Sequence, residues 1–140
     1  MAAAVRRLPV ALIGAGRLGA GHARILAALP SARLVLIADP RPEVQALGAS
    51  LGVSVVPEPL AAVHSPDVAA VVIVTPTATH AALIEAAAGA GKAILCEKPV
   101  ALDVPTTEGA LAAVRRAGVP LQIGFQRRYD PGYQEARRRI

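Results

Sequence analysis

The sequence contains few cysteine and aromatic residues, and these shortages exclude several classes of protein. Its 140 residues include one cysteine, no tryptophan, one phenylalanine and two tyrosines. One cysteine excludes an internal disulfide, so we expect a reducing, cytoplasmic setting. No apolar run reaches the ~18–20 residues that a membrane-spanning helix needs, so we expect no membrane partner. The apolar share of 54% argues against disorder and predicts one domain with a buried core.

Positive charge exceeds negative charge, and the excess gathers near the C-terminus. The formal net charge is +5. Five arginines lie in the last stretch of the chain: Arg127, Arg128, Arg137, Arg138 and Arg139. All three aromatic residues lie between positions 125 and 133, and basic residues interleaved with aromatic ones can form a nucleic-acid surface. We favour a solvated basic helix face without a nucleic-acid partner, because the rest of the chain has a nucleotide-cofactor pattern.

Apolar runs of strand length alternate with alanine-rich helical stretches. Strands are predicted at 8–13, 33–38, 53–56, 68–74, 92–96 and 120–125, and helices at 17–29, 41–51, 59–64, 78–90, 106–117 and 131–140. This alternation predicts an α/β fold with a parallel sheet covered on both faces. Six strands suffice for a doubly wound sheet in the order 3-2-1-4-5-6.

Local signals refine three of these boundaries. The start of the chain, Met1 to Arg7 with the following apolar stretch, weakly resembles an export signal. We interpret the apolar stretch as the first strand, because it leads directly into a glycine-rich turn. Thr77 is predicted as the N-cap of the fourth helix, and Asp130 followed by Pro131 as the start of the last one.

The glycine-rich turn after the first strand predicts a phosphate site. Gly14, Gly16 and Gly19 have the G-x-G-x-x-G spacing and open the first helix. They suit, in that order, a tight turn, the close approach of a pyrophosphate and close helix–strand packing. Backbone N–H groups of the turn and of the helix N-terminus would bind the phosphates. The predicted cofactor contacts here also include Arg17 and Leu18.

An acidic residue ends the second predicted strand, where a dinucleotide-binding fold contacts the adenosine ribose. Asp39 lies 20 residues after Gly19. Its carboxylate would accept hydrogen bonds from the ribose hydroxyls and repel a 2′-phosphate, so we predict NAD as the cofactor. Arg41 could instead pair with that phosphate, so NADP remains possible.

Two further loops lie at the carboxyl ends of the fourth and fifth strands, where such sheets bind ligands. Thr75, Pro76, Thr77 and His80 are predicted to border the cofactor. The alternative for His80 is a histidine on the helix surface.

In the loop after the fifth strand, Lys98 can donate a hydrogen bond to a reacting oxygen, and partial burial would lower its pKa. The alternative for Lys98 is an exposed lysine beside a turn proline. Cys96 is predicted to be a small buried strand residue. No metal site is predicted.

Together these motifs resemble the Gfo/Idh/MocA oxidoreductases. The resemblance is carried by Gly14 to Gly19, His22-Ala23, Asp39-Pro40, Thr75-Pro76-Thr77 with His80, and Glu97-Lys98-Pro99. The segment from Gly124 to Asp130 looks most like the myo-inositol 2-dehydrogenase branch. The resemblance implies an N-terminal NAD(P)-binding Rossmann domain of an enzyme that transfers a hydride from a sugar or cyclitol hydroxyl to the cofactor.

The resemblance also implies roles for single residues. Lys98 would contact the substrate and aid proton transfer, Arg127 would be a further substrate contact, and Glu97 would border the cofactor. For His22 we expect packing on the first helix.

The family's C-terminal α/β domain would supply a catalytic Asp and His. Residues 1–125 are then expected to form the cofactor domain, and 126–140 to begin a connecting helix toward a domain that is missing. Such a truncated chain is expected to bind cofactor, to turn over poorly or not at all, and to self-associate through exposed apolar surface.

Two other functions stay open at this point. One is a stand-alone dinucleotide-binding module, which senses or sequesters NAD or pairs with a separate C-terminal chain. The other is an interaction protein that uses the arginine-rich tail.

Overall fold

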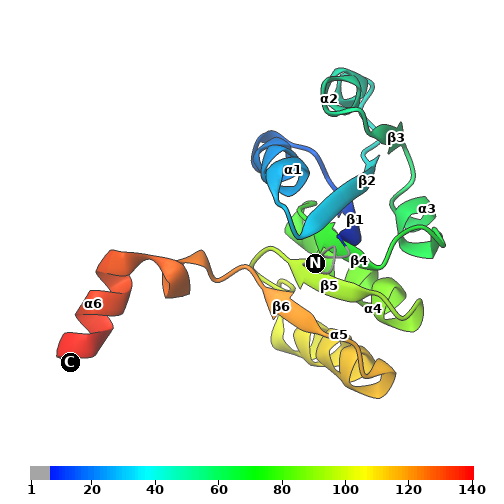
Figure 1. The fold of residues 1–140 in the computed structure, drawn as a ribbon. Coiled ribbons are helices and arrows are strands. Elements are labelled where there is room, and N and C mark those ends of the chain that lie inside the picture. Colours follow the sequence, from blue (N-terminus) through cyan, green and yellow to red (C-terminus); the bar gives the residue numbers. More distant parts are fainter. Residues whose placement is uncertain (1–6) are drawn as a thin grey trace, which may run out of the picture.

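Six parallel strands form one sheet in the order β3-β2-β1-β4-β5-β6 in the computed structural model, which describes residues 7–140 (Figure 1). The strands are β1 (Leu8–Ile13), β2 (Ala32–Ala38), β3 (Ser54–Val56), β4 (Ala70–Ile73), β5 (Ala93–Cys96) and β6 (Leu121–Ile123). The helices are α1 (Arg17–Ala28), α2 (Val44–Leu51), α3 (Pro59–His64), α4 (His80–Gly89), α5 (Val104–Ala117) and α6 (Pro131–Arg139). The predicted α/β class, doubly wound sheet and strand order are confirmed. Most of the segment that resembles an export signal lies outside the described residues.

The strand order reverses at β1, which pairs with β2 on one side and with β4 on the other. Side chains alternate between the two faces of the sheet, so β1 contributes Ala11 and Ile13 to one core and Val10 and Leu12 to the other. All four residues are buried. A parallel sheet needs such apolar residues on both faces, because helices cover both.

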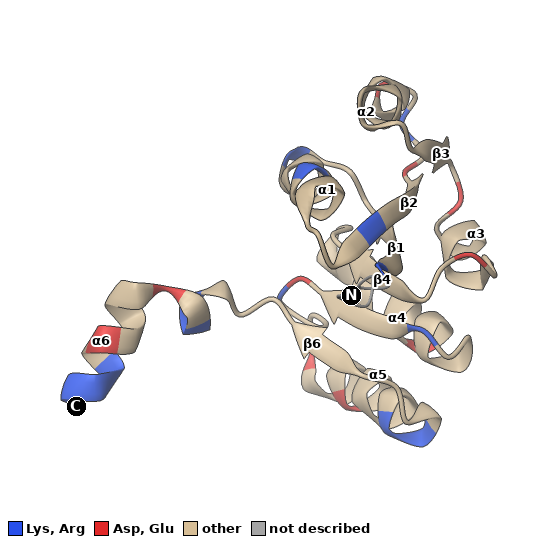
Figure 2. Ribbon diagram, viewed as in Figure 1, with Lys and Arg blue, Asp and Glu red and all other residues tan. Residues whose placement is uncertain are grey.

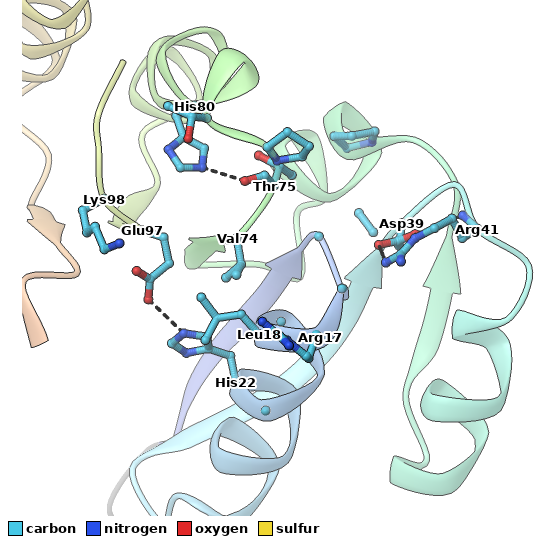
Figure 3. Close-up of a pocket in the computed structure, with 18 of the residues that line it drawn as sticks. Arg17, Leu18, His22, Asp39, Arg41, Val74, Thr75, His80, Glu97 and Lys98 are labelled. Carbon is cyan, nitrogen blue, oxygen red and sulfur yellow. Dashed lines mark hydrogen bonds and ion pairs between the residues drawn. The ribbon is translucent and has the colours of Figure 1, made fainter. Parts of the chain in front are cut away.

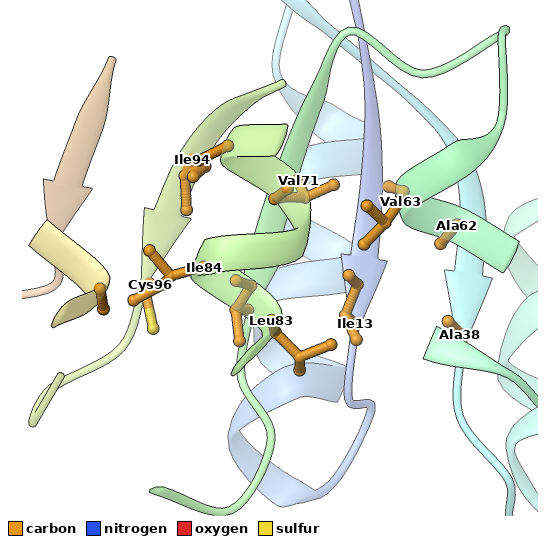
Figure 4. Packing of buried hydrophobic residues seen from close by; sticks show 14 of the residues in the cluster. Ile13, Ala38, Ala62, Val63, Val71, Leu83, Ile84, Ile94 and Cys96 are labelled. Atoms are coloured by element: carbon orange, nitrogen blue, oxygen red, sulfur yellow. The ribbon is translucent and has the colours of Figure 1, made fainter. Parts of the chain in front are cut away.

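Two layers of helices bury these faces. Helices α3, α4 and α5 cover the face that carries Ile13, and Figure 4 shows Val63, Ile84 and Cys96 packed there. Helices α1 and α2 cover the opposite face through Ala23 and Val44. Full burial of each large aliphatic side chain contributes about 1.5–3 kcal/mol, so this double layer holds the strand ends in place.

The start of the fourth helix differs from the prediction. Residues Thr77–Thr79 form a short 3-10 turn, η1, and α4 begins only at His80. The N-cap prediction for Thr77 is wrong, because Thr79 holds that position. The Thr79 hydroxyl lies 2.7 Å from Thr75 Oγ1 and 2.8 Å from Pro76 O, so it closes the preceding loop instead of capping the helix.

Two other helices also start at a different residue. Helix α2 begins at Val44 and not at 41, because the N–H of Arg41 donates to the Asp39 carboxylate. Helix α5 begins at Val104, two residues earlier than predicted, because Asp103 accepts a hydrogen bond from the N–H of Thr106 at 2.8 Å.

The chain leaves the sheet after β6 and ends in α6, which stands away from the sheet (Figure 1). A 3-10 turn, η2 (Gln126–Tyr129), precedes it, and Asp130 caps α6 as predicted by accepting from two backbone N–H groups. Figure 2 shows the basic end of α6, where Arg138 and Arg139 pair with Glu135 of the same helix. Throughout residues 7–140, each helix is too short or too polar to traverse a membrane.

Candidate cofactor-binding site

A cavity of about 980 Å³ opens at the carboxyl ends of the strands, where the strand order reverses (Figure 3). This volume is at the upper end of the ~300–1,000 Å³ usual for small-molecule sites. Its lining includes every residue predicted to contact the cofactor: Gly14, Gly16, Arg17, Leu18, Gly19, Asp39, Arg41, Thr75, Pro76, Thr77, His80 and Glu97, together with Lys98. Gly14 and Lys98, 84 positions apart in the chain, therefore line one site, because the parallel strands end at one edge of the sheet.

The three glycines of the loop are needed for three different reasons. Gly14 has a φ of +89°, and a Cβ there would lie 2.7 Å from Val74 O, so both the backbone conformation and the space require glycine. A Cβ on Gly19 would overlap Gly14 O, which brings α1 close to the turn. A Cβ on Gly16 would meet only Arg41 Nη2, at 3.8 Å. Gly16 therefore faces open space in the cavity.

The N-terminus of α1 carries backbone donors that no side chain caps. Gly16 is the N-cap residue, and the first turn contains no acidic residue. The first N–H groups of a helix have no acceptor within the helix, and the helix dipole adds partial positive charge there. Arg17, the first residue of α1, adds a full positive charge to the cavity wall. This end of the cavity therefore suits an anion such as a pyrophosphate.

Asp39 is an acidic residue of the cavity wall at the end of β2, and it is only 5% exposed. Its Oδ2 accepts from the N–H of Ala15 at 2.7 Å and from Arg41 Nη2 at 2.7 Å. Its Oδ1 accepts from the N–H and the Nε of Arg41 at 3.0 and 2.9 Å. The Arg41 guanidinium and the two backbone donors outweigh burial and lower the pKa of Asp39 to about 2. The carboxylate is thus ionised and oriented by the chain itself.

His80 joins the loops that follow β4 and β5. The side chain is buried, with only 1% of the residue exposed, so the alternative of a surface histidine is wrong. Its Nδ1 lies 2.7 Å from Pro99 O and its Nε2 lies 2.8 Å from Thr75 O. Both ring nitrogens are therefore engaged by the backbone, and His80 fixes the spacing of Thr75 and Pro99 at the cavity wall.

Glu97 forms a polar pair across the cavity. His22 Nε2 lies 3.0 Å from Glu97 Oε1, so His22 does more than pack on α1 (Figure 3). On the other side of Glu97, a Cβ added to Gly124 would lie 2.9 Å from its Oε2. The carboxylate of Glu97 is consequently held between α1 and the end of β6.

Lys98 and Arg127 lie at a second, smaller cavity of about 490 Å³ next to the first. Lys98 and Gln126 line both cavities, whereas Phe125, Arg127 and Arg128 line only the second. The partial burial expected for Lys98 is not found, because the residue is exposed. Arg127 donates to the hydroxyl of Tyr133 at 2.5 Å.

Some lining residues carry no recognisable motif. Ile25 and Val74 contribute apolar surface. Gln126 lies in the segment from Gly124 to Asp130 that carries the resemblance, but it was not predicted as a site residue. Cys96 is fully buried as predicted, and burial raises its pKa to about 12. In the part of the chain that the structure describes, no three His, Cys, Asp or Glu side chains are grouped to hold a metal ion.

Comparison with known proteins identifies a family and several relatives of this chain. Residues 8–125 match the GFO_IDH_MocA family model, described as "Oxidoreductase family, NAD-binding Rossmann fold". The chain is 41% identical over 133 residues to scyllo-inositol 2-dehydrogenase (NAD(+)) of Bacillus subtilis (strain 168), covering 93% of this chain and 39% of that protein. It is 43% identical over 131 residues to inositol 2-dehydrogenase of Rhizobium meliloti (strain 1021), covering 92% and 39%.

A solved structure of a related enzyme has the same fold over this length. Scyllo-inositol dehydrogenase from Lactobacillus casei, crystallised with NAD(H) and scyllo-inositol, superposes with a TM-score of 0.90 at 32% identity. The match covers 95% of this chain and 40% of that one. The chain therefore spans about two fifths of the length of these relatives.

Proposed function

Because the chain belongs to the Gfo/Idh/MocA oxidoreductase family, with an NAD-binding Rossmann fold over residues 8–125, we propose that it forms the cofactor-binding part of an inositol dehydrogenase-like enzyme. One observation carries the proposal: the uncapped N-terminus of α1, the open side of Gly16 and the ionised Asp39 face the same cavity. The substrate class follows from the relatives, whose names specify inositol.

We assign the parts of NAD to the cavity in order. The backbone donors at Gly16 and the start of α1, with Arg17, would hold the pyrophosphate. Asp39 would accept from the hydroxyls of the adenosine ribose. The loops at Thr75 and Glu97 would border the nicotinamide end, and His80 would set the distance between the loops after β4 and β5.

When bound, NAD⁺ accepts a hydride from the carbon that carries the reacting hydroxyl. Lys98 lies where the two cavities meet, so its ammonium can donate a hydrogen bond to the substrate oxygen and its amine form can take the proton that this oxygen releases. Arg127 would contact another oxygen of the substrate. The pair of Glu97 and His22 would fix the loop that carries Lys98.

We also propose that the cofactor domain ends near Phe125 and that 126–140 is the start of a connecting helix. Exposed Phe125, Tyr129 and Tyr133 give this segment apolar surface, which favours self-association. Concentration-dependent light scattering tests that expectation, and a monomer at every concentration would contradict it. The single buried cysteine agrees with a location in the cytoplasm.

Titration of the 140-residue chain with NADH tests the proposal directly. The chain has no tryptophan, so the emission of NADH itself is the signal, and it should change along a saturable curve that NAD⁺ reverses. Absence of saturable binding would overturn the proposed function.

An assay for NADH formation with NAD⁺ and myo-inositol separates binding from catalysis. We expect no turnover by the chain alone, because Lys98 provides only one member of an acid–base system. Binding without turnover fits both a cofactor domain and a stand-alone module.

A further inference from the structure

The pair of His22 and Glu97 carries a charge that depends on one proton. His22 Nε2 lies 3.0 Å from Glu97 Oε1, and the two side chains are 25% and 17% exposed (Figure 3). Partial burial reduces the screening of charge by water and salt. With a neutral imidazole the pair carries the full negative charge of the carboxylate, whereas with an imidazolium it carries no net charge.

Gly124 lets the Glu97 carboxylate reach His22. A Cβ added to Gly124 would lie 2.9 Å from Glu97 Oε2, 3.0 Å from Cδ and 3.1 Å from Oε1. Gly124 does not have a positive φ, so alanine would suit the backbone there, and the carboxylate would have to move instead. The position of the negative charge beside His22 therefore depends on the absence of a side chain at the end of β6.

Among residues 7–140, five other charged or titratable groups line this cavity: Arg17, Asp39, Arg41, His80 and Lys98. Asp39 and Arg41 pair with each other, and Arg17 lies at the proposed pyrophosphate position. His80 is buried between two backbone carbonyl groups. Lys98 is exposed, so water screens its charge more than that of Glu97.

Two further cations lie on the neighbouring elements but do not line this cavity. Arg24 of α1 donates to the carbonyl group of Ala20, and Arg127 after β6 lines only the second cavity. The charge that varies beside Glu97 near neutral pH is thus the proton of His22, because histidine ordinarily changes charge between pH 5 and 8.

We infer that His22 and Glu97 set the relative affinity of the site for the oxidised and the reduced cofactor. This inference rests on the proposed function, which assigns the nicotinamide end to the loop at Glu97. NAD⁺ and NADH differ in charge only at the nicotinamide ring, which is a cation in NAD⁺ and neutral in NADH. An unneutralised carboxylate beside the ring therefore favours NAD⁺.

Protonation of His22 removes this preference. In acid the pair has no net charge, and Lys98 adds a positive charge that opposes the cationic ring. As the pH rises, His22 loses its proton and the negative charge of Glu97 is no longer neutralised. The affinity for NAD⁺ relative to NADH should therefore increase with pH.

The ratio of two dissociation constants measures this effect. The Kd of NADH follows from the emission of its nicotinamide ring, and that of NAD⁺ from displacement of NADH, at about pH 5.5 and about pH 8. Both cofactors share the adenosine and the pyrophosphate, so dividing the Kd of NADH by that of NAD⁺ cancels titrations that affect both equally.

Three substitutions and one control assign the effect to the pair. H22Q keeps an amide donor for Glu97 but does not titrate, E97Q removes the negative charge, and G124A displaces the carboxylate without removing it. H64Q replaces a histidine at the exposed end of α3 and is the control. Thermal unfolding shows that each variant is folded.

We expect the ratio to be about threefold larger at the higher pH in the unsubstituted chain and in H64Q, which is the size of one partly exposed charge interaction. H22Q should give the higher ratio at both pH values. E97Q should lower the ratio about threefold at the higher pH. G124A should show a smaller change with pH than the unsubstituted chain.

The outcomes distinguish this inference from the proposed function. A ratio that does not change with pH in the unsubstituted chain, a full change that persists in H22Q, or an unaltered ratio in E97Q overturns the role of the pair and leaves the proposed function standing. Failure of all five proteins to bind NADH overturns both.

Discussion

Replacement of Asp39 by asparagine tests whether the buried carboxylate stabilises the fold as its contacts indicate. D39N keeps the size of the side chain but removes the charge that pairs with Arg41 at 2.7 Å. The pKa of Asp39 falls from the ordinary value of 3.8 to about 2 in the folded chain. A depressed pKa means that the ionised form stabilises the folded state relative to the unfolded one.

The size and the direction of the effect follow from these two pKa values. Their difference corresponds to about 2 kcal/mol of stability, which is fully present above the unfolded value of 3.8. It is lost as the pH falls through 3.8 toward 2, and about half of it should remain near pH 3. The free energy of unfolding of D39N should therefore be about 2 kcal/mol lower than that of the unsubstituted chain at pH 7. This difference should disappear in strong acid.

Urea denaturation followed by circular dichroism at several pH values between 7 and 2 measures this difference. The quantity compared at each pH is the difference in the free energy of unfolding between the unsubstituted chain and D39N, because the other carboxylates titrate in both proteins. D67N provides the control, since Asp67 is exposed, and it should change stability by less than about 0.5 kcal/mol at every pH. A gap between the unsubstituted chain and D39N that stays constant down to pH 2 would refute the reasoning.

Two further sets of substitutions test the glycine loop and His80. G16A should fold normally but lose at least tenfold in NADH affinity in a fluorescence titration, because its Cβ enters the open cavity. G19A should lose more than about 3 kcal/mol of stability in urea, because its Cβ overlaps the backbone of Gly14. Equal effects of the two substitutions on stability would contradict these assignments. H80A should cost about 2–3 kcal/mol in the same urea assay, because a buried side chain is removed and the carbonyl groups of Thr75 and Pro99 lose the ring nitrogens that contact them. H64A on the exposed end of α3 should cost almost nothing. Similar losses for H80A and H64A would show that His80 does not hold the two loops.

The sheet could be predicted from the sequence because each strand is an apolar run followed by a turn residue. The G-x-G-x-x-G spacing and Asp39 marked the two strands that meet at the site, and the doubly wound order followed from the alternation of strands and helices. Boundaries were less predictable. The starts of α2 and α4 depend on hydrogen bonds of Asp39 and Thr79, which compete locally with helix formation.

The internal contacts of the site were not predictable from spacing alone. His80 bonds to carbonyl groups 5 and 19 residues away, so its burial depends on how two loops meet in space. The pairing of His22 with Glu97 spans 75 residues and two elements. Arg41 was recognised as a possible phosphate ligand, but its closure onto Asp39 needs the geometry of the turn after β2. The exposure of Lys98 likewise depends on which loops surround it.

The burial of Cys96 has a practical consequence for labelling the chain with a dye. It is the only cysteine of the chain, it is fully buried, and its pKa of about 12 leaves almost no reactive thiolate at neutral pH. One cysteine introduced at an exposed position, such as Ser50 at the end of α2, would therefore be the single site that a maleimide dye modifies. A dye at that position would report on the segment between Arg41 and α2 without any prior removal of native cysteines.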